Sequence, residues 1–294
     1  MRRRRSWLAL AVVTGAGLVS SGCAVGVDGT PVAAESVDRA EVTTCEYPTE
    51  PGGFDSVPTT PPPQMTDPGQ RTLYQQQIDR VLAGRSKQRS SPEPAAQQPK
   101  SGILKVTLTT DQGSIPIVVD RADAPCNVAA VVSLAEHGYY DDTPCHRMTD
   151  TADLKVIQCG DPTGTGIGNP GWTSPDEPPT GLRPSGPVDP TSGAQTVIYP
   201  RGTVAIANRG PRPDAQNSGG GAQFFILQSD GTLPASYAVV GTVDSAGMSV
   251  VDKVFAGGIV PGVGVDPVTG RHRLDPQDGS PKSPLTIESV TVSD

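Results

Sequence analysis

The first residues that offer chemistry are an arginine and a glutamine in one stretch, residues 145–161, which reads CHRMTDTADLKVIQCGD. Arg147 follows a histidine, and Gln158 lies near the end of a second short apolar run. An arginine keeps its charge and presents rigid N–H groups, so a guanidinium held by the Gln158 amide is suited to donate hydrogen bonds to a bound ligand. The alternative is a surface arginine that pairs with Asp150 or Asp153.

A glycine-rich stretch, NSGGGAQFFIL, could indicate a second kind of chemistry, nucleophilic catalysis by a serine. Around Ser218 it resembles the nucleophile loop of trypsin-like serine proteases, whose glycines supply an oxyanion hole. Against this, Asn217 stands where those enzymes have an acidic residue, and His146 lacks their small-residue histidine motif. A turn is the better interpretation. The stretch DPTGTGIGNPG is also interpreted as a loop, because no helix with Lys–Ser/Thr follows it as phosphate binding requires.

The cysteines indicate disulfides. Outside the cytosol four cysteines can form two bridges, and the sequence does not choose among the three pairings. A zinc site is the alternative, but no pair has metal-ligand spacing, so we expect no metal. The cysteines beyond residue 23 are Cys45, Cys126, Cys145 and Cys159, and the histidines are His137, His146 and His272.

The composition and charge exclude some classes of protein. Of the 294 residues, 34 are glycine and 31 proline, while 35% are apolar, which indicates many turns or a sizeable unstructured part. The net charge of −8 and the pI near 4.9 argue against a nucleic-acid binder, which would carry a basic face. The acidity is typical of a soluble surface.

The N-terminus, MRRRRSWLALAVVTGAGLVSSGC, has the form of an export signal. Four arginines precede an apolar run that is too short for an ordinary membrane-spanning helix. The ending resembles a bacterial lipobox, in which Cys23 takes a diacylglycerol, although Ser20 stands where leucine is usual. We expect residues 1–23 to be a lipoprotein signal and the chain to be anchored to the outer face of the cell membrane. The alternative is a plain cleaved signal with an incidental cysteine.

Residues 24–100 are predicted to be a disordered extracytoplasmic tether. They are rich in Pro, Ser, Thr and Gly, with little to bury. A short helix over residues 72–84 is compatible with the pattern, but it would be marginal in isolation.

From Ile103 the pattern is that of a folded domain, expected over residues 101–294. ILKVTLTT and SIPIVVD alternate apolar and polar residues, as half-buried strands do. Apolar residues then recur at i, i+3, i+4 and i+7, predicting a helix with Asp123 as a cap at its start and Gly138 at its end.

The remaining elements complete a barrel. A second helix is predicted over MSVVDKVFAGG. Further strands are predicted over residues 145–148 and 155–158 and over GTVAIAN, AQFFIL, YAVVGTV and LTIESVTV. Because closure removes exposed edges, eight short strands and two helices indicate an all-β dominated fold, an eight-stranded closed antiparallel barrel capped by two helices.

Several ordered blocks resemble the cyclophilin-type peptidyl-prolyl cis-trans isomerases over roughly residues 102–294. The blocks are APCNVAAVVSLAEHGYYDDTPCHR, VIQCGDPTGTG, GTVAIANRGPRPDAQNSGGGAQFFIL and YAVVGTV. The acidic, Pro-rich form is similar to the membrane-anchored cyclophilins of actinobacteria. The resemblance implies an eight-stranded barrel with two helices. It also implies a monomer that assists the folding of exported proteins by acting on their proline-containing segments.

The resemblance assigns the catalytic role to Arg147. An X–Pro amide crosses a barrier of about 18–20 kcal/mol, and a hydrogen bond to the prolyl nitrogen reduces its resonance. Arg147 is expected to donate this bond, with Gln158 holding the guanidinium. Neither cofactor nor metal is needed. His146 is interpreted as a buried structural histidine on the opposite face of the strand, not as a base.

The same resemblance assigns the substrate-binding residues. Phe224 and Phe225 face opposite ways by alternation, so only one of them can line the groove. The matched positions are Val156, Phe225 and Leu233 in the proline pocket, Tyr237 beside it, and Ala207, Asn208 and Gln223 along the flanking peptide.

The sequence also departs from the family. The stretch between Arg147 and Gln158 is about three residues longer than usual, and its pocket aromatic has no clear match, Leu154 or Lys155 lying nearest. Thr232 replaces a tryptophan common in eukaryotic members. A pocket with less aromatic area should bind proline more loosely. The alternative function is therefore a non-catalytic module or chaperone that binds proline peptides.

Overall fold

One large antiparallel sheet of eleven strands is the main element of the described structure. The structure is a computed structural model, and it describes residues 41–188, 195–210, 219–266 and 269–294. The strand order is β14 (Ile259–Val265), β15 (His272–Pro281), β6 (Arg147–Asp150), β7 (Lys155–Cys159), β11 (Phe224–Leu227), β10 (Thr203–Ile206), β13 (Val239–Val243), β4 (Gly113–Asp120), β3 (Ile103–Thr110), β16 (Thr286–Ser293) and β5 (Thr143–Pro144).

The prediction of a closed eight-stranded barrel was wrong in strand number and in closure. Strands lie over all eight predicted segments, but the sheet has eleven strands. Across the described ranges, no ladder joins β14 at one end of the sheet to β5 at the other. Two features account for this. The β14–β15 hairpin extends the sheet beyond β6, and the chain changes partner between β5 and β6, where the Cys145 N–H donates to the Leu285 carbonyl and the His146 N–H to the Gln158 carbonyl.

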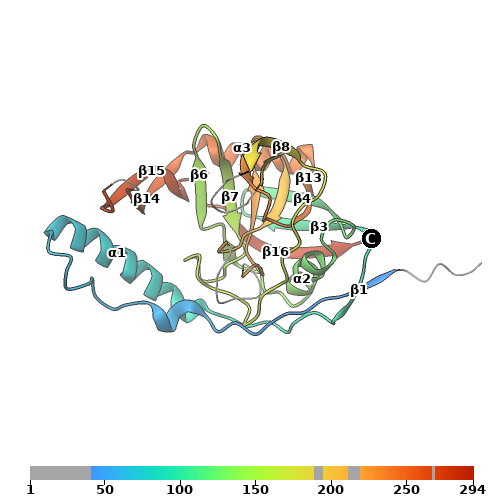
Figure 1. Ribbon diagram of the computed structural model, residues 1–294, viewed down its shortest axis with the longest axis horizontal. Helices are drawn as coiled ribbons and strands as arrows, with labels where there is room; N and C mark the ends of the chain where they lie inside the picture. The colour runs from blue at the N-terminus through green and yellow to red at the C-terminus, as the bar shows by residue number, and fades with distance from the viewer. Residues whose placement is uncertain (1–40, 189–194, 211–218, 267–268) are drawn as a thin grey trace, which may run out of the picture. The chain divides into compact units, whose positions relative to one another are not determined.

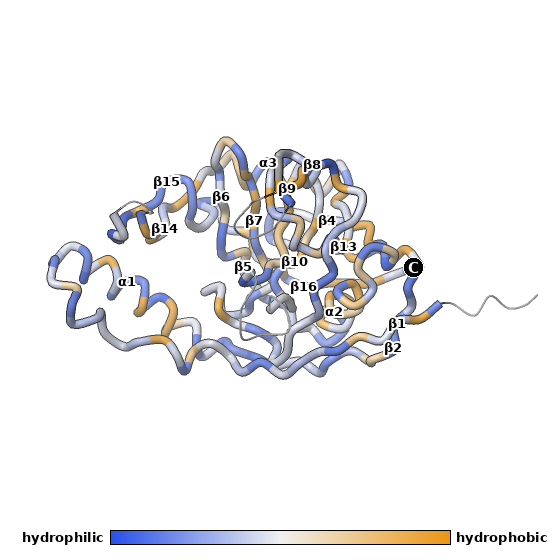
Figure 2. The backbone as a smooth tube through the Cα atoms, in the orientation of Figure 1, coloured by the Kyte–Doolittle hydropathy of each residue, from blue (hydrophilic) through white to orange (hydrophobic). Residues whose placement is uncertain are grey.

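Alternation along the strands builds the main core. Met148, Ile157 and Ile226 are fully buried on the face that α2 (Pro125–Glu136) and α3 (Ser245–Ala256) help to cover. In Figure 2, α2 is drawn mostly in the colours of apolar residues. The expected cap of α2 was wrong. Asp123 does not cap it, and the Glu177 carboxylate instead accepts the first free backbone N–H groups of the helix.

Three further strands form a smaller sheet. Its strand order is β12 (Gly231–Pro234), β9 (Gln195–Tyr199) and β8 (Arg183–Val188). The apolar side chains of β9 pack against the outer face of the large sheet, where the candidate site lies.

The described part of the expected tether, residues 41–100, is structured. It contains β1 (Val42–Thr44), η1 (Gly53–Ser56), α1 (Pro68–Gly84), η2 (Arg85–Lys87) and β2 (Gln97–Pro99). Asp67 caps α1 by accepting the Gln70 backbone N–H. A tether was predicted from composition, but packing against the rest of the chain and a disulfide from Cys45 to Cys126 stabilise these elements.

Contacts link α1 to the β14–β15 hairpin, and Figure 1 shows the helix and the hairpin near each other. The described residues belong to one compact unit, so no break separates residues 41–100 from the domain expected to begin at residue 101. Among the described helices, none is long and apolar enough to span a membrane. The predicted lipidation site, Cys23, lies outside the described residues.

Candidate active site

One row of side chains crosses four strands on the face turned away from the main core. Strand by strand it consists of Arg147, Gln158, Phe225 and Ala205, each opposite the next in the antiparallel register. Neighbouring strands lie about 4.8 Å apart, so the backbone of Arg147 lies roughly 10 Å from that of Phe225. The sheet therefore places a guanidinium and an apolar surface on the same face. Arg147 and Gln158 are thus direct partners across β6 and β7.

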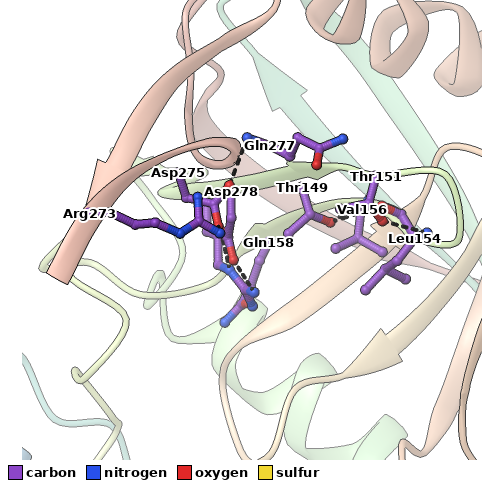
Figure 3. Close-up of polar contacts among 10 residues, drawn as sticks. Thr149, Thr151, Leu154, Val156, Gln158, Arg273, Asp275, Gln277 and Asp278 are labelled. Carbon is purple, nitrogen blue, oxygen red and sulfur yellow. Dashed lines mark hydrogen bonds and ion pairs between the residues drawn. The ribbon is translucent and has the colours of Figure 1, made fainter. Parts of the chain in front are cut away.

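Arg147 is held from two sides. Its Nε and Nη2 donate to the two carboxylate oxygens of Asp278 over 2.8 and 2.7 Å, and its Nη1 donates to Gln158 Oε1 over 3.3 Å. Figure 3 shows Asp278 and Gln158 close together. The hydrogen bonds from Arg147 to Asp278 raise the pKa of the guanidinium, so it stays protonated. Because a guanidinium has five N–H donors, two remain for a ligand.

The ion pair orients the guanidinium more than it stabilises the fold. The Arg147 side chain is 46% exposed and that of Asp278 38% exposed. Ion pairs this open to water contribute little to the free energy of unfolding, but a bidentate pair fixes a guanidinium plane. The expected alternative partner, Asp150, pairs with Lys155 at 2.5 Å instead.

A hydrogen-bond chain continues from Gln158 into the neighbouring loop. Gln158 Nε2 donates to Gln223 Oε1 over 2.8 Å, and Gln223 Nε2 donates to the carbonyls of Gly166 and Gly168 over 2.9 and 3.0 Å. The buried Asp161 carboxylate accepts the backbone N–H groups of the same two glycines over 2.6 and 3.2 Å. The loop therefore fixes Gln223, which fixes Gln158 and, through it, the guanidinium.

The residues predicted to bind the flanking peptide lie together. Ala207, Asn208 and Gln223 line a cavity of about 80 Å³ with Gln158. The Asn208 side chain donates to the Ser236 carbonyl over 2.8 Å, which holds this wall of the cavity in place.

The residues predicted for the proline pocket also gather in one apolar cluster. Phe225 and Tyr237 meet edge to face with ring centroids 5.4 Å apart. Phe224 lies in the main core, so Phe225 is the phenylalanine on the site face. The buried members are Val156, Val197, Tyr199, Ala205, Phe225 and Leu227, and those packed against them are Leu154, Leu182, Ala207, Leu233, Ala235, Tyr237 and Val239.

The longer hairpin contributes one apolar side chain to this cluster. Leu154 packs on the cluster, whereas Lys155 forms an ion pair with Asp150. Leu154 is therefore the residue that occupies the position of the family's pocket aromatic. Figure 3 shows Leu154 and Val156 at the end of the hairpin remote from Asp278. Thr232 is exposed beside this cluster.

Sequence reasoning missed Tyr199. The residue is fully buried, and its hydroxyl donates to the Pro234 carbonyl over 3.1 Å while accepting the Tyr237 backbone N–H over 3.2 Å. Tyr199 thus fixes the segment that carries Tyr237 and restores some of the lost aromatic area. The alternation within QTVIY was a signal for this strand.

The ring nitrogens of His146 are buried as predicted, but the side chain does not face away from Arg147. It lies at the break between β5 and β6, outside regular alternation, and lines a second cavity together with Arg147. The pKa of His146 is lowered to about 4, chiefly by burial; the nearby Asp161 carboxylate raises the pKa, and Arg147 and Arg80 lower it. The imidazole is therefore neutral at pH 7.

The cysteine pairing is now assigned. Cys45 bonds to Cys126, and Cys145 bonds to Cys159, so these thiols are not available as metal ligands. The second bridge joins the two strand segments that carry Arg147 and Gln158. Ser218, the residue of the protease alternative, lies outside the described residues.

These features agree with the family comparison. The family model described as cyclophilin type peptidyl-prolyl cis-trans isomerase/CLD matches residues 105–292. The chain belongs to the cyclophilin-type peptidyl-prolyl cis-trans isomerase family.

Mycobacterial proteins are among its relatives. The probable peptidyl-prolyl cis-trans isomerase B of Mycobacterium leprae is 38% identical over 189 residues, which is 64% of this chain and 57% of the relative. The protein of the same description from Mycobacterium tuberculosis H37Rv is 36% identical, over 64% of this chain and 54% of its own. The chain thus matches little more than half the length of these curated relatives.

A crystal structure of a cyclophilin type peptidyl-prolyl cis-trans isomerase from Cryptosporidium parvum is also similar. It is 21% identical with a TM-score of 0.44, covering 66% of this chain and 99% of that chain. The structure of the same protein in the presence of the dipeptide Ala-Pro gives a TM-score of 0.43 and covers 65% of this chain.

Proposed function

We propose that this protein is a peptidyl-prolyl cis-trans isomerase that accelerates X–Pro isomerisation in exported proteins and so assists their folding outside the cytoplasm. The observation that carries the proposal is the fixed guanidinium of Arg147, on the same sheet face as the apolar cluster around Phe225. Membership of the isomerase family supports it.

In the proposed mechanism, the apolar cluster around Phe225 binds the proline ring and the Arg147 guanidinium acts on the X–Pro bond. The apolar cluster, with Val156, Phe225 and Leu233, holds the proline ring out of water. A free N–H of Arg147 donates to the prolyl nitrogen, whose lone pair is available only when the amide is twisted. This bond is stronger in the transition state than in either planar state, as catalysis requires. Gln158 and Asp278 hold the donor in place before substrate arrives.

The flanking peptide is proposed to lie along Ala207, Asn208 and Gln223. These residues line the cavity next to Gln158, so a peptide bound there would reach Arg147 with its X–Pro bond. Tyr237 would contact the proline ring from the edge of the apolar cluster. No cofactor takes part in this mechanism.

An isomerisation assay separates this function from the alternative of a binding module. The full chain is mixed with a short capped X–Pro peptide, and cis–trans exchange is measured by NMR together with the dissociation constant. We expect exchange well above the buffer rate. Binding of the peptide with exchange at the buffer rate would favour the non-catalytic binding module or chaperone.

We also propose that the protein works as a monomer at the outer face of the cell membrane, anchored through lipidated Cys23. The support is the export-signal pattern and the lipobox-like ending of residues 1–23. Mass spectrometry of the mature N-terminus tests this. A mass that includes a diacylglycerol on Cys23 is expected, and an unmodified N-terminus at another residue would contradict the anchor.

A further inference from the structure

A second cavity adjoins the proposed active site on the other side of Gln158. Its volume is about 330 Å³, and Gln158 and Gly166 line both this cavity and the one that holds Gln223. The other lining residues come from α1, the His146–Arg147 segment, the Gly166 loop and the β14–β15 hairpin. A peptide bound at Arg147 is therefore within reach of this cavity.

The wall that α1 supplies is fixed in place. Gln70 of α1 bonds to the backbone of His272 on the hairpin, donating to its carbonyl over 2.7 Å and accepting its N–H. The Tyr74 ring meets the His272 ring edge on, with centroids 4.9 Å apart, and Asp67 pairs with Arg271 at 3.1 Å. Helix α1, which lies in the segment expected to be a disordered tether, is thus part of the wall of this cavity.

Two polar groups of the cavity have no protein partner. The exposed Arg80 side chain of α1 makes no hydrogen bond or ion pair within the described ranges. Both ring nitrogens of His146 are buried, and neither has a hydrogen-bond partner among the described residues. Buried polar atoms are nearly always bonded, so an unpartnered imidazole facing a cavity points to a ligand that supplies the missing bond.

The charges of the lining favour an anion. Both of its carboxylates already have a guanidinium beside them, because Asp278 pairs with Arg147 and Asp275 lies 3.6 Å from Arg273, which it shares with Asp266. Arg80 is the remaining charge. Figure 3 shows Asp275 and Asp278 on the hairpin with Arg273 beside them. A ligand carboxylate near Arg80 would therefore meet an unmatched cation and, at His146, an N–H donor.

We propose that this cavity is a second substrate subsite, which binds the carboxylate of an aspartate or glutamate side chain close to the X–Pro bond. Arg80 is the ionic partner and His146 the hydrogen-bond donor. The inference rests on the proposed isomerase function and adds a preference for acidic residues near the proline. It makes α1 part of the substrate-binding surface.

The test uses capped X–Pro peptides, so that no terminal carboxylate competes. Glutamate, glutamine or lysine is placed in turn at each of the two positions on either side of the X–Pro pair, and kcat/KM is measured with the full chain at low salt. The wild type should favour glutamate over glutamine at one position by about threefold to fivefold, as for a partly exposed ion pair. The preference should shrink in 0.5 M salt.

Two variants decide the assignment. Arg80→Gln should abolish the preference for glutamate and leave the rate on the glutamine peptide unchanged. Lys87→Gln, which removes the same charge from η2 outside the cavity, should keep the preference. Equal rates on the glutamate and glutamine peptides at every position, or a preference that survives Arg80→Gln, would overturn the subsite. Turnover of the glutamine peptide reports the isomerase function separately, and its absence would overturn that function and the subsite with it.

Discussion

Asp278 accepts hydrogen bonds from both Nε and Nη2 of Arg147, although 131 residues of sequence separate the two side chains. The β14–β15 hairpin makes this contact possible, because β15 pairs with β6 and brings Asp278 opposite Thr149. The guanidinium is thus fixed by a hairpin that lies beyond the eight strands expected from the sequence.

Replacing Asp278 should impair catalysis without impairing peptide binding. Asp278→Asn keeps the size of the side chain but loses the charge, so the guanidinium is held less firmly. We expect kcat to fall about fivefold, the equivalent of about 1 kcal/mol, with KM nearly unchanged. Steady-state assays on peptides with neutral flanking residues measure this. Asp275→Asn is the matched control, since Asp275 lies on the same hairpin and pairs with Arg273. Equal losses in both variants would contradict a positioning role.

Tyr199→Phe should loosen the wall of the proline pocket. The change removes the hydroxyl that donates to the Pro234 carbonyl and accepts the Tyr237 N–H, so the Tyr237 N–H loses its partner, while the Pro234 carbonyl still accepts the Ser236 N–H. We expect about 1–2 kcal/mol less free energy of unfolding and a higher KM, with kcat little changed. Urea denaturation and peptide titration measure the two effects. A fall in kcat at unchanged KM would show that Tyr199 acts on Arg147 instead.

The Cys45–Cys126 bridge should stabilise the whole described unit. It joins the segment before α1 to α2 across 81 residues, so its loss frees a long loop in the unfolded chain. The double variant Cys45→Ser, Cys126→Ser should lower the free energy of unfolding by about 2–4 kcal/mol. Urea denaturation under non-reducing conditions measures this. The parent chain in reducing buffer should lose at least as much, and an unchanged midpoint in the variant would contradict the prediction.

His146 should make the fold sensitive to mild acid. Its pKa of about 4 in the folded chain lies below the ordinary value of about 6.5, so the unfolded chain binds the extra proton between these values. Stability should therefore be complete above about pH 6.5 and fall as the pH drops towards 4, by about 2–3 kcal/mol. His146→Gln should flatten this part of the profile. Denaturation at pH 4.5 and pH 7 compares the two proteins, and parallel profiles would contradict the assignment.

The local parts of the fold could be predicted from the sequence, because they rest on periodicity. Alternation located the strands that carry Arg147, Gln158 and Phe225 and set Phe225 and Phe224 on opposite faces. Alternation predicted the wrong face for the buried His146, because regular strand structure is interrupted between β5 and β6.

Contacts distant in sequence could not be predicted. Asp278, Glu177 and the helix α1 reach their partners across 50 or more residues, and no local pattern encodes such a pairing. The tether prediction failed for the same reason, since a composition rich in proline does not reveal the disulfide to Cys126. Arg147, Gln158 and Phe225 could be identified from the sequence. The contact from Asp278 that fixes Arg147 is visible only in the structure.

In the proposed mechanism, the guanidinium of Arg147 lowers the barrier to rotation of a bound X–Pro bond. The most direct measurement is the exchange rate of a saturating X–Pro peptide, with its dissociation constant, for the wild type, Arg147→Lys and Arg147→Ala. We expect the exchange rate to fall about a hundredfold or more in Arg147→Ala and by an intermediate factor in Arg147→Lys. The dissociation constants of both variants should stay within about threefold of the wild-type value. Exchange in Arg147→Ala at the wild-type rate would contradict this mechanism.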